Sequence, residues 1–250
     1  MANWSDPKAG LQGEARVGLD TGARDVAYDA GLRSYMLKVY NYMASGILLT
    51  GIVAMLFARG GVESPAATIS MSGGLLSWVI MLSPLAFILV MSFGMNRMST
   101  GALQACCWAF ATVMGLSLST IFLRYTGTSI AHTFFATSAA FVSLSLWGYT
   151  TKKDLSGWGT FLIMGVVGLL VAMVINIFLQ SQAMAYVISG IGVLVFAGLT
   201  AYDTQKIKSM YQYVAGTDMM GKTVIMGALN LYLDFINMFL FLLNFMGGRE

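Results

Sequence analysis

The chain has 250 residues, of which 57% are hydrophobic and only 10% are charged, and its mean hydropathy is +0.74. Soluble domains carry about 25% charged residues, so this composition excludes an ordinary soluble protein and predicts an all-α, polytopic membrane protein. The formal net charge of +3 is too small to indicate a nucleic-acid partner.

The first 34 residues are polar and mixed in charge, with Lys8 and Arg16 set against Asp6 and Glu14. They lack the basic start, short apolar core and small-residue cleavage site of a secretory signal. We therefore expect two parts: a mobile cytoplasmic tail over residues 1–34, and a seven-helix transmembrane domain over residues 35–250 whose first helix is an uncleaved anchor.

Seven apolar segments follow, each of roughly 20 residues, which is enough to cross a hydrocarbon core about 30 Å thick as a helix. Gly, Asn, Ser, Pro and charged residues separate them. The fifth and sixth segments are separated only by the short, uncharged stretch Gln180–Gln182. These two segments could therefore form a re-entrant pair instead of two full spans. The predicted spans are Tyr35–Phe57, Leu75–Met95, Gly101–Phe122, Ile130–Tyr149, Gly157–Phe178, Ala183–Tyr202 and Thr223–Phe245.

Lys and Arg residues divide unequally between the two ends of these spans. Only Arg59, Arg124 and Arg249 fall on one side, while the other eleven fall on the side of the N-terminal tail. Because cytoplasmic loops are enriched in Lys and Arg, we expect a cytoplasmic N-terminus in the inner (plasma) membrane of a bacterium. With seven spans, the C-terminus would then lie outside.

The last predicted span carries a stripe of polar side chains. Asn230, Asp234, Asn237 and Asn244 recur at steps of four, three and seven residues, so they share one face of a helix. A carboxylate at the bilayer centre costs at least about 2.5 kcal/mol. This helix is therefore predicted to lie at the centre of the bundle, surrounded by the other six.

A second carboxylate, Asp203, ends the sixth span, and its helix is antiparallel to the one that carries Asp234. Two carboxylates close together in low dielectric must share a proton, pair with a cation or bind a metal ion. Arg97, predicted on the same side of the membrane as Asp203, is a natural counter-ion. Oxygen-only ligands, with Asn230 or Asn237 nearby, suit Ca²⁺. The residues thus indicate an ion or proton pathway.

No resident cofactor and no catalytic centre is predicted. The only cysteines, Cys106 and Cys107, are adjacent within an apolar run, and such a pair cannot complete a four-ligand zinc site. The expected partners are the lipid bilayer, Ca²⁺ and protons, together with other membrane proteins.

The end of the sixth span, GLTAYDTQKI at 198–207, and the stretch ALNLYLDFIN at 228–237 together resemble the Bax inhibitor family, also called the transmembrane Bax inhibitor motif proteins. GLSL at 115–118 and INIF at 175–178 are further matches. The resemblance covers nearly all of the chain after the tail, and LYLDFIN is its most specific part.

The resemblance implies a bacterial-type member with seven helices, six of them around a polar last helix, acting as a pH-sensitive Ca²⁺ leak channel. The family's paired aspartates would be Asp203 and Asp234, which would sense pH and contact Ca²⁺, and its gating arginine would be Arg97. Relatives often carry a cluster of basic residues at the position of the gating arginine, whereas here Arg97 is a single basic residue that follows Asn96.

Other classes remain as alternatives. A non-conducting regulator of a protease or of another membrane protein is compatible with every residue. Intramembrane aspartyl proteases also carry one Asp on each of two consecutive spans, but Tyr232-Leu233-Asp234 is not their glycine-bracketed GxGD. A serine protease would need Ser117 and His132 as a dyad, and the histidine falls near a membrane face. We therefore expect no enzymatic activity.

Overall fold

The computed structural model describes residues 7–248, and the regular structure in this part of the chain is entirely helical. Side-chain surroundings are described from Val26 onward. The helices are α1 (Pro7–Phe57), η1 (Gly61–Glu63), α2 (Pro65–Ser72), α3 (Leu75–Gly94), α4 (Thr100–Leu118), η2 (Ser119–Leu123), α5 (Gly127–Thr150), α6 (Ser156–Leu179), α7 (Gln182–Val214) and α8 (Met219–Met246).

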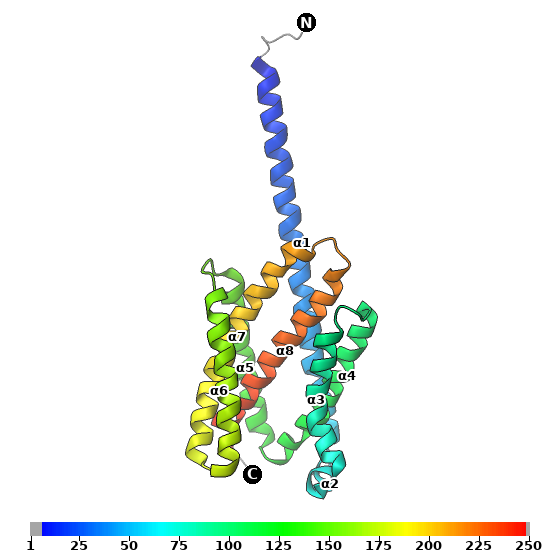
Figure 1. The fold of residues 1–250 in the computed structure, drawn as a ribbon, viewed down its shortest axis with the longest axis vertical. Coiled ribbons are helices and arrows are strands. Elements are labelled where there is room, and N and C mark those ends of the chain that lie inside the picture. The colour runs from blue at the N-terminus through cyan, green and yellow to red at the C-terminus, as the bar shows by residue number, and fades with distance from the viewer. Residues whose placement is uncertain (1–6, 249–250) are drawn as a thin grey trace.

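Seven helices in the described residues are long and apolar enough to cross a membrane, which confirms the predicted all-α polytopic class. They run over Val26–Phe57, Leu75–Gly94, Thr100–Leu123, Gly127–Thr150, Ser156–Leu179, Gln182–Val214 and Met219–Met246. The chain enters the bundle at one end and its last described residues lie at the other (Figure 1). Gly248 is fastened there, because its N–H donates to Ser129 Oγ over 2.7 Å.

Local sequence signals set the helix boundaries. Ser99, Thr126 and Ser181 precede α4, α5 and α7, and each side-chain oxygen accepts a hydrogen bond from the backbone N–H three residues later. Gln180 adopts a left-handed conformation with φ of 50° and ends α6. The short connection at Gln180 and Ser181 therefore joins two helices that are each long and apolar enough to span the membrane, which favours two full spans over a re-entrant pair.

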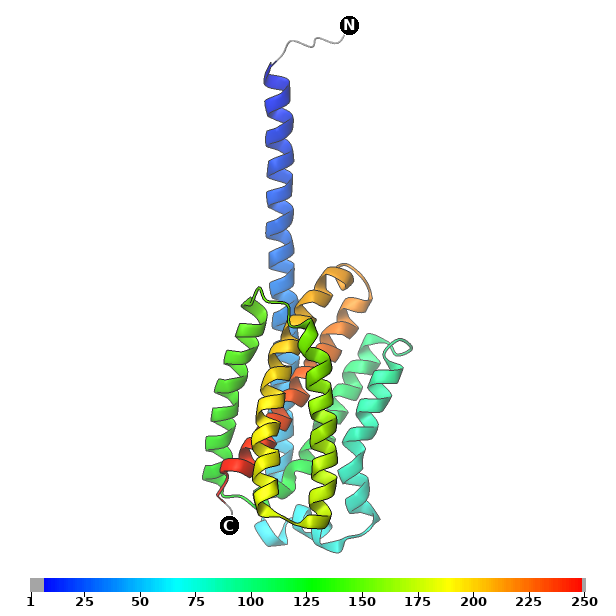
Figure 2. The same ribbon diagram turned by 60° about the vertical axis from the view of Figure 1, so that its left-hand side comes forward.

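Two elements differ from the predicted boundaries. The first connection contains the extra helix α2, which starts with Pro65 after the cap Ser64, a favoured start for a helix. Helix α1 begins well before Tyr35 and projects beyond the bundle (Figures 1 and 2). The segment expected as a separate tail thus continues α1 from Pro7, residues 1–6 lie outside the described part, and its mobility stays a prediction.

Helix α8 lies at the centre of the bundle. Within its most apolar 18-residue window 72% of residues are buried, against 33% or less in the other six spans. It passes diagonally between its neighbours and packs on α1, α4, α5 and α7 (Figures 1 and 2). Helices α3 and α6 form an outer layer, α3 against α4 and α6 against α7. The prediction of a central last helix is confirmed.

Candidate functional site

Asp234 lies in the middle of α8 and is 4% exposed. Its neighbours along the helix, Tyr232, Phe235 and Met238, are also buried, so α8 is covered on nearly every side. The oxygen Oδ2 of Asp234 is buried and has no hydrogen-bond partner among the described residues. A buried carboxylate oxygen left without a partner is costly, which marks this position as a site with a role other than packing.

Asp203 lies on α7, opposite α8. It is 11 residues from Val214 at the end of its helix, and Asp234 is 15 residues from Met219 at the start of the next one. At 1.5 Å per residue these positions are about 17 and 23 Å from the α7–α8 connection. Asp203 is partly buried, and its carboxyl group is close enough to that of Asp234 for the two to interact electrostatically. The structure thus brings the two predicted aspartates together.

The positive charge that acts on Asp203 comes from its own helix. Lys206, one turn further along α7, is the basic group that interacts with the Asp203 carboxylate. The Lys206 ammonium is exposed and lies 5.9 Å from the centre of the Tyr202 ring. Among the described residues no cation acts on Asp234, which lies deeper in the bundle than Asp203.

Arg97 lies at the end of the second span, as predicted, but it is not in contact with the aspartates. It lies in the turn between α3 and α4, at the same end of the bundle as the α7–α8 connection (Figure 1). Its side chain is exposed and forms no ion pair with either aspartate in the part of the chain that is described. The structure therefore does not join Arg97 to the pair, and sequence reasoning overlooked Lys206 as the nearer cation.

The two asparagines of the predicted polar pathway flank Asp234 at one helical turn on either side. Asn230 and Asn237 are both partly buried. Asn237 donates its amide N–H to Leu233 O over 2.8 Å, which leaves its side-chain oxygen free to accept or to ligate. The polar stripe is thus continuous over about two turns of α8.

The side-chain oxygens of the two aspartates and two asparagines are the predicted contacts for Ca²⁺. Among the residues whose side chains the structure describes, no group of three or more His, Cys, Asp or Glu could hold a metal ion. Ca²⁺ takes six to eight oxygen ligands, so two carboxylates and two amides would need water for the rest. These few oxygens suit a Ca²⁺ ion that keeps part of its water shell and binds transiently better than one that is bound permanently.

A row of hydrogen-bonded hydroxyl groups that includes Thr204, the residue after Asp203, was not predicted. Tyr40 OH lies 2.7 Å from Ser145 Oγ, which lies 2.9 Å from Thr204 Oγ1, and Thr204 Oγ1 donates to Thr200 O over 2.7 Å. These hydrogen bonds link α1, α5 and α7. Thr204, which takes part in two of them, directly follows Asp203 in the sequence. The only signal in the sequence is the pair of threonines at 200 and 204, which share a helix face with each other.

The residues of the serine-protease alternative lie apart from each other. Ser117 Oγ donates its hydrogen bond to Ile80 O of α3 over 2.6 Å. His132 is exposed on α5. No hydrogen bond of the described residues joins the two side chains, and a serine nucleophile without its base is inactive. This arrangement gives no support to the serine-protease alternative.

The fold and this site together define a polytopic membrane protein of seven helices with a paired-carboxylate centre on its last two spans. The family described as "Inhibitor of apoptosis-promoting Bax1" matches residues 32–250, and the chain belongs to this Bax inhibitor family.

Similar proteins occur across bacteria. The chain is 47% identical to an uncharacterised protein of Rickettsia prowazekii over 233 residues, which are 93% of this chain and 97% of the relative. It is 41% identical to the inner membrane protein YbhL of Escherichia coli over 223 residues, 88% of this chain and 94% of YbhL. The seven apolar helices and the likeness to YbhL support an integral inner-membrane location.

Proposed function

We propose that this protein is a pH-sensitive, calcium-permeable leak channel of the bacterial inner membrane, gated by Asp203 and Asp234. The observation that carries the proposal is a pair of interacting carboxylates on α7 and the central helix α8, of which Asp234 has a buried oxygen with no partner among the described residues. A polar group in this position is expensive, and in a membrane protein it usually marks a path for an ion or a proton.

The polar stripe of α8 supplies the path in this proposal. Asn230 and Asn237 offer amide oxygens one helical turn before and after Asp234, and the hydroxyls of Ser145 and Thr204, the residue after Asp203, add further polar groups. In the closed state at least one carboxylate is ionised and held by a cation, which keeps α7 and α8 together. Lys206 or a bound Ca²⁺ provides this cation, and Arg97 is a further candidate that would have to move toward Asp203 from the α3–α4 turn.

Acidification opens the path. Protonation removes the negative charge that the cation holds, so the attraction across the α7–α8 interface weakens. Protons and Ca²⁺ compete for the same oxygens, so the affinity for Ca²⁺ falls as the pH falls. The N-terminus is cytoplasmic in this scheme. The chain has no catalytic role and no resident cofactor, and its partners are Ca²⁺, protons, the bilayer and other membrane proteins.

Calcium flux into liposomes, measured from acidic to alkaline pH, tests the proposal. The wild-type protein should conduct more Ca²⁺ as the pH falls. Asp203→Asn and Asp234→Asn each remove a titrating group at nearly constant shape, so each should flatten this response. The double variant should add little, because the pair acts as one unit.

Asp154→Asn is the matched control. Asp154 is fully exposed in the α5–α6 connection, where hydrogen bonds from the side chain and backbone of Ser156 lower the pKa of its carboxyl group. It therefore stays ionised under mildly acidic conditions, and its replacement should leave the response unchanged. Wild-type pH dependence in both single variants would show that the paired carboxylates are only structural. No flux in any preparation would favour the alternative, a non-conducting regulator of a protease or other membrane protein.

A further inference from the structure

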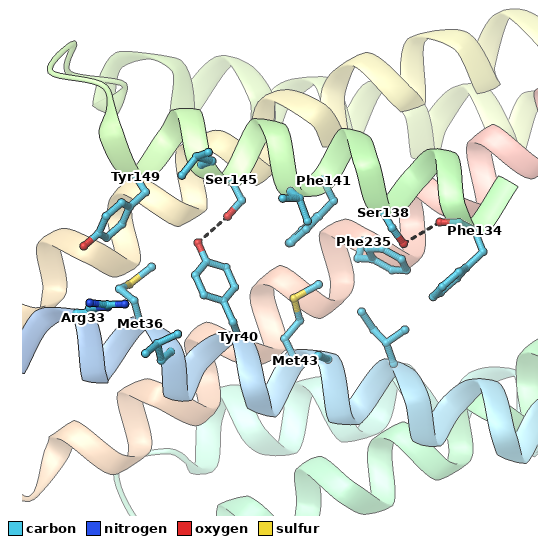
Figure 3. A pocket seen from close by; sticks show the side chains of 15 residues that line it. Arg33, Met36, Tyr40, Met43, Phe134, Ser138, Phe141, Ser145, Tyr149 and Phe235 are labelled. Carbon is cyan, nitrogen blue, oxygen red and sulfur yellow. Dashed lines mark hydrogen bonds between the residues drawn. The ribbon is translucent and has the colours of Figure 1, made fainter. Parts of the chain in front are cut away.

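A long apolar groove runs between α1 and α5. It has a volume of about 600 Å³, within the about 300–1,000 Å³ typical of ligand pockets. Met36, Met43 and Phe141 form its inner wall together with Phe235 of α8 (Figure 3). Helices α1 and α5 both pack on α8 and make little contact with each other. A hydrogen bond between Tyr40 and Ser145 bridges the two helices across this groove (Figure 3).

The groove opens toward the bilayer. Its rim consists of apolar side chains that are more than half exposed, namely Leu37 on α1 and Val142 and Leu146 on α5. All three lie inside helices long and apolar enough to span the membrane. An open apolar space at this level faces hydrocarbon chains rather than water, so a lipid tail is the molecule that can fill it.

The length of the groove fits one leaflet. Its lining extends from Arg33 to Ile47 on α1 and from Phe134 to Tyr149 on α5, which is about 20 Å along each helix at 1.5 Å per residue. One leaflet of a hydrocarbon core about 30 Å thick is about 15 Å deep. A single acyl chain can therefore occupy most of the groove, and the remaining length at the Arg33 end lies at the level of the headgroup.

A polar cavity of about 660 Å³ continues the groove at that end, because Arg33 and Tyr149 line both. The polar cavity also contains Lys208 of α7, whose Nζ donates to Tyr149 O over 2.7 Å and lies 4.8 Å from the centre of the Tyr149 ring. This lysine is fixed in place with further N–H groups to offer. Asp29 is the single acidic residue of the lining, so the two cations leave a net positive charge.

From this apolar groove with a cationic end, we propose that the α1–α5 groove binds an anionic phospholipid. One acyl chain lies along Met36, Met43 and Phe141, and the phosphate contacts Arg33 and Lys208. The guanidinium of Arg33 suits a phosphate because it offers several N–H groups in one plane. A zwitterionic lipid fits the groove equally well but gains less at the cationic end, so the site selects for negative charge.

Native mass spectrometry of the purified protein, taken from vesicles with equal amounts of phosphatidylglycerol and phosphatidylcholine, tests this site. The wild-type protein should retain phosphatidylglycerol in several-fold excess. Arg33→Gln with Lys208→Gln should abolish that excess. Lys152→Gln with Lys153→Gln removes the same charge at the same end of the bundle but outside both cavities, and it should keep the excess.

The apolar part of the site has its own variants. Ala44→Trp and Val142→Trp each fill the groove from one wall without a change of charge, and each should reduce the retention of both lipids several-fold. Variants are compared only where the melting temperature in detergent matches that of the wild type. Unchanged lipid retention in the groove-filled variants would overturn the proposal, and so would equal loss in the two charge-removal variants. Displacement of the lipid by soluble glycerol phosphate would show a headgroup site alone and would likewise overturn it.

Discussion

The hydroxyl groups of Tyr232 and Thr50 lie 2.7 Å apart in the interior of the bundle and join α8 to α1. Thr50 also donates its single hydroxyl hydrogen to Ala111 O over 2.8 Å. Because a threonine hydroxyl has only one hydrogen, Tyr232 must be the donor in their shared bond. Tyr232 precedes Asp234 by two residues on α8, so the two side chains point to nearly opposite faces of this helix. The bond from Tyr232 to α1 therefore fixes the rotation of α8 that turns Asp234 toward α7.

Tyr232→Phe should lower the stability of the protein by about 1 kcal/mol, the usual net value of a buried hydrogen bond. Thermal unfolding in detergent measures the change. Tyr213→Phe is the control, since Tyr213 is exposed on α7, and it should melt like the wild type. If Tyr232→Phe and Thr50→Val have strictly additive effects, the two hydroxyls are not coupled and the assignment of the bond is wrong.

Gly148→Ala should disrupt the contact between α5 and α7. A methyl group at Gly148 would overlap the backbone of Ala201, and overlap with a packed backbone costs about 1–3 kcal/mol. Gly168→Ala on α6 is a matched control, because no atom lies within 4 Å of its added methyl group. The first variant should lose melting temperature or yield in detergent, and the second should not. Equal stability of both would show that α5 and α7 are further apart than described.

The central position of α8 predicts weak lipid contact along it. In a protein whose native cysteines are replaced by alanine, Asn230→Cys, Asn237→Cys and Met238→Cys should react poorly with a probe dissolved in the bilayer. Ile177→Cys on the outer helix α6, where Ile177 is 68% exposed, should react strongly. Strong labelling of all three α8 positions would contradict a shielded last helix.

Much of this arrangement could be predicted from the sequence, because it depends on signals within single segments. Apolar length gives the spans, and a carboxylate amid apolar residues must be shielded, which gives the central helix and the Asp203–Asp234 pair. The hydroxyl contacts of Tyr40, Ser145 and Thr204 and the α1–α5 groove depend on how far each helix is rotated and shifted against its neighbours. No local pattern encodes that register, and for the same reason Lys206 was overlooked in favour of Arg97.

Reporter fusions test the orientation inferred from the eleven-to-three division of Lys and Arg. A reporter inserted after Lys153, which follows four spans, should be active only on the cytoplasmic side. A reporter after Glu250, which follows all seven, should be active only outside. Activity on the same side for both fusions would require an even number of spans between them and would contradict the sequence of alternating helices.

The last prediction distinguishes the two candidate cations. Lys206 interacts with the Asp203 carboxylate, whereas Arg97 is exposed and contacts neither aspartate. A positive neighbour favours the ionised form of a carboxylate, so its removal lets the group take up a proton at higher pH. If Lys206 holds the pair in its closed state, Lys206→Gln should move the midpoint of the pH-dependent Ca²⁺ flux to higher pH, while Arg97→Gln should leave it in place. The shift should shrink at high salt, because the ammonium of Lys206 is exposed to solvent and its interaction is screened. A shift in Arg97→Gln alone would instead mean that the closed channel brings the α3–α4 turn against Asp203, in an arrangement different from the one described.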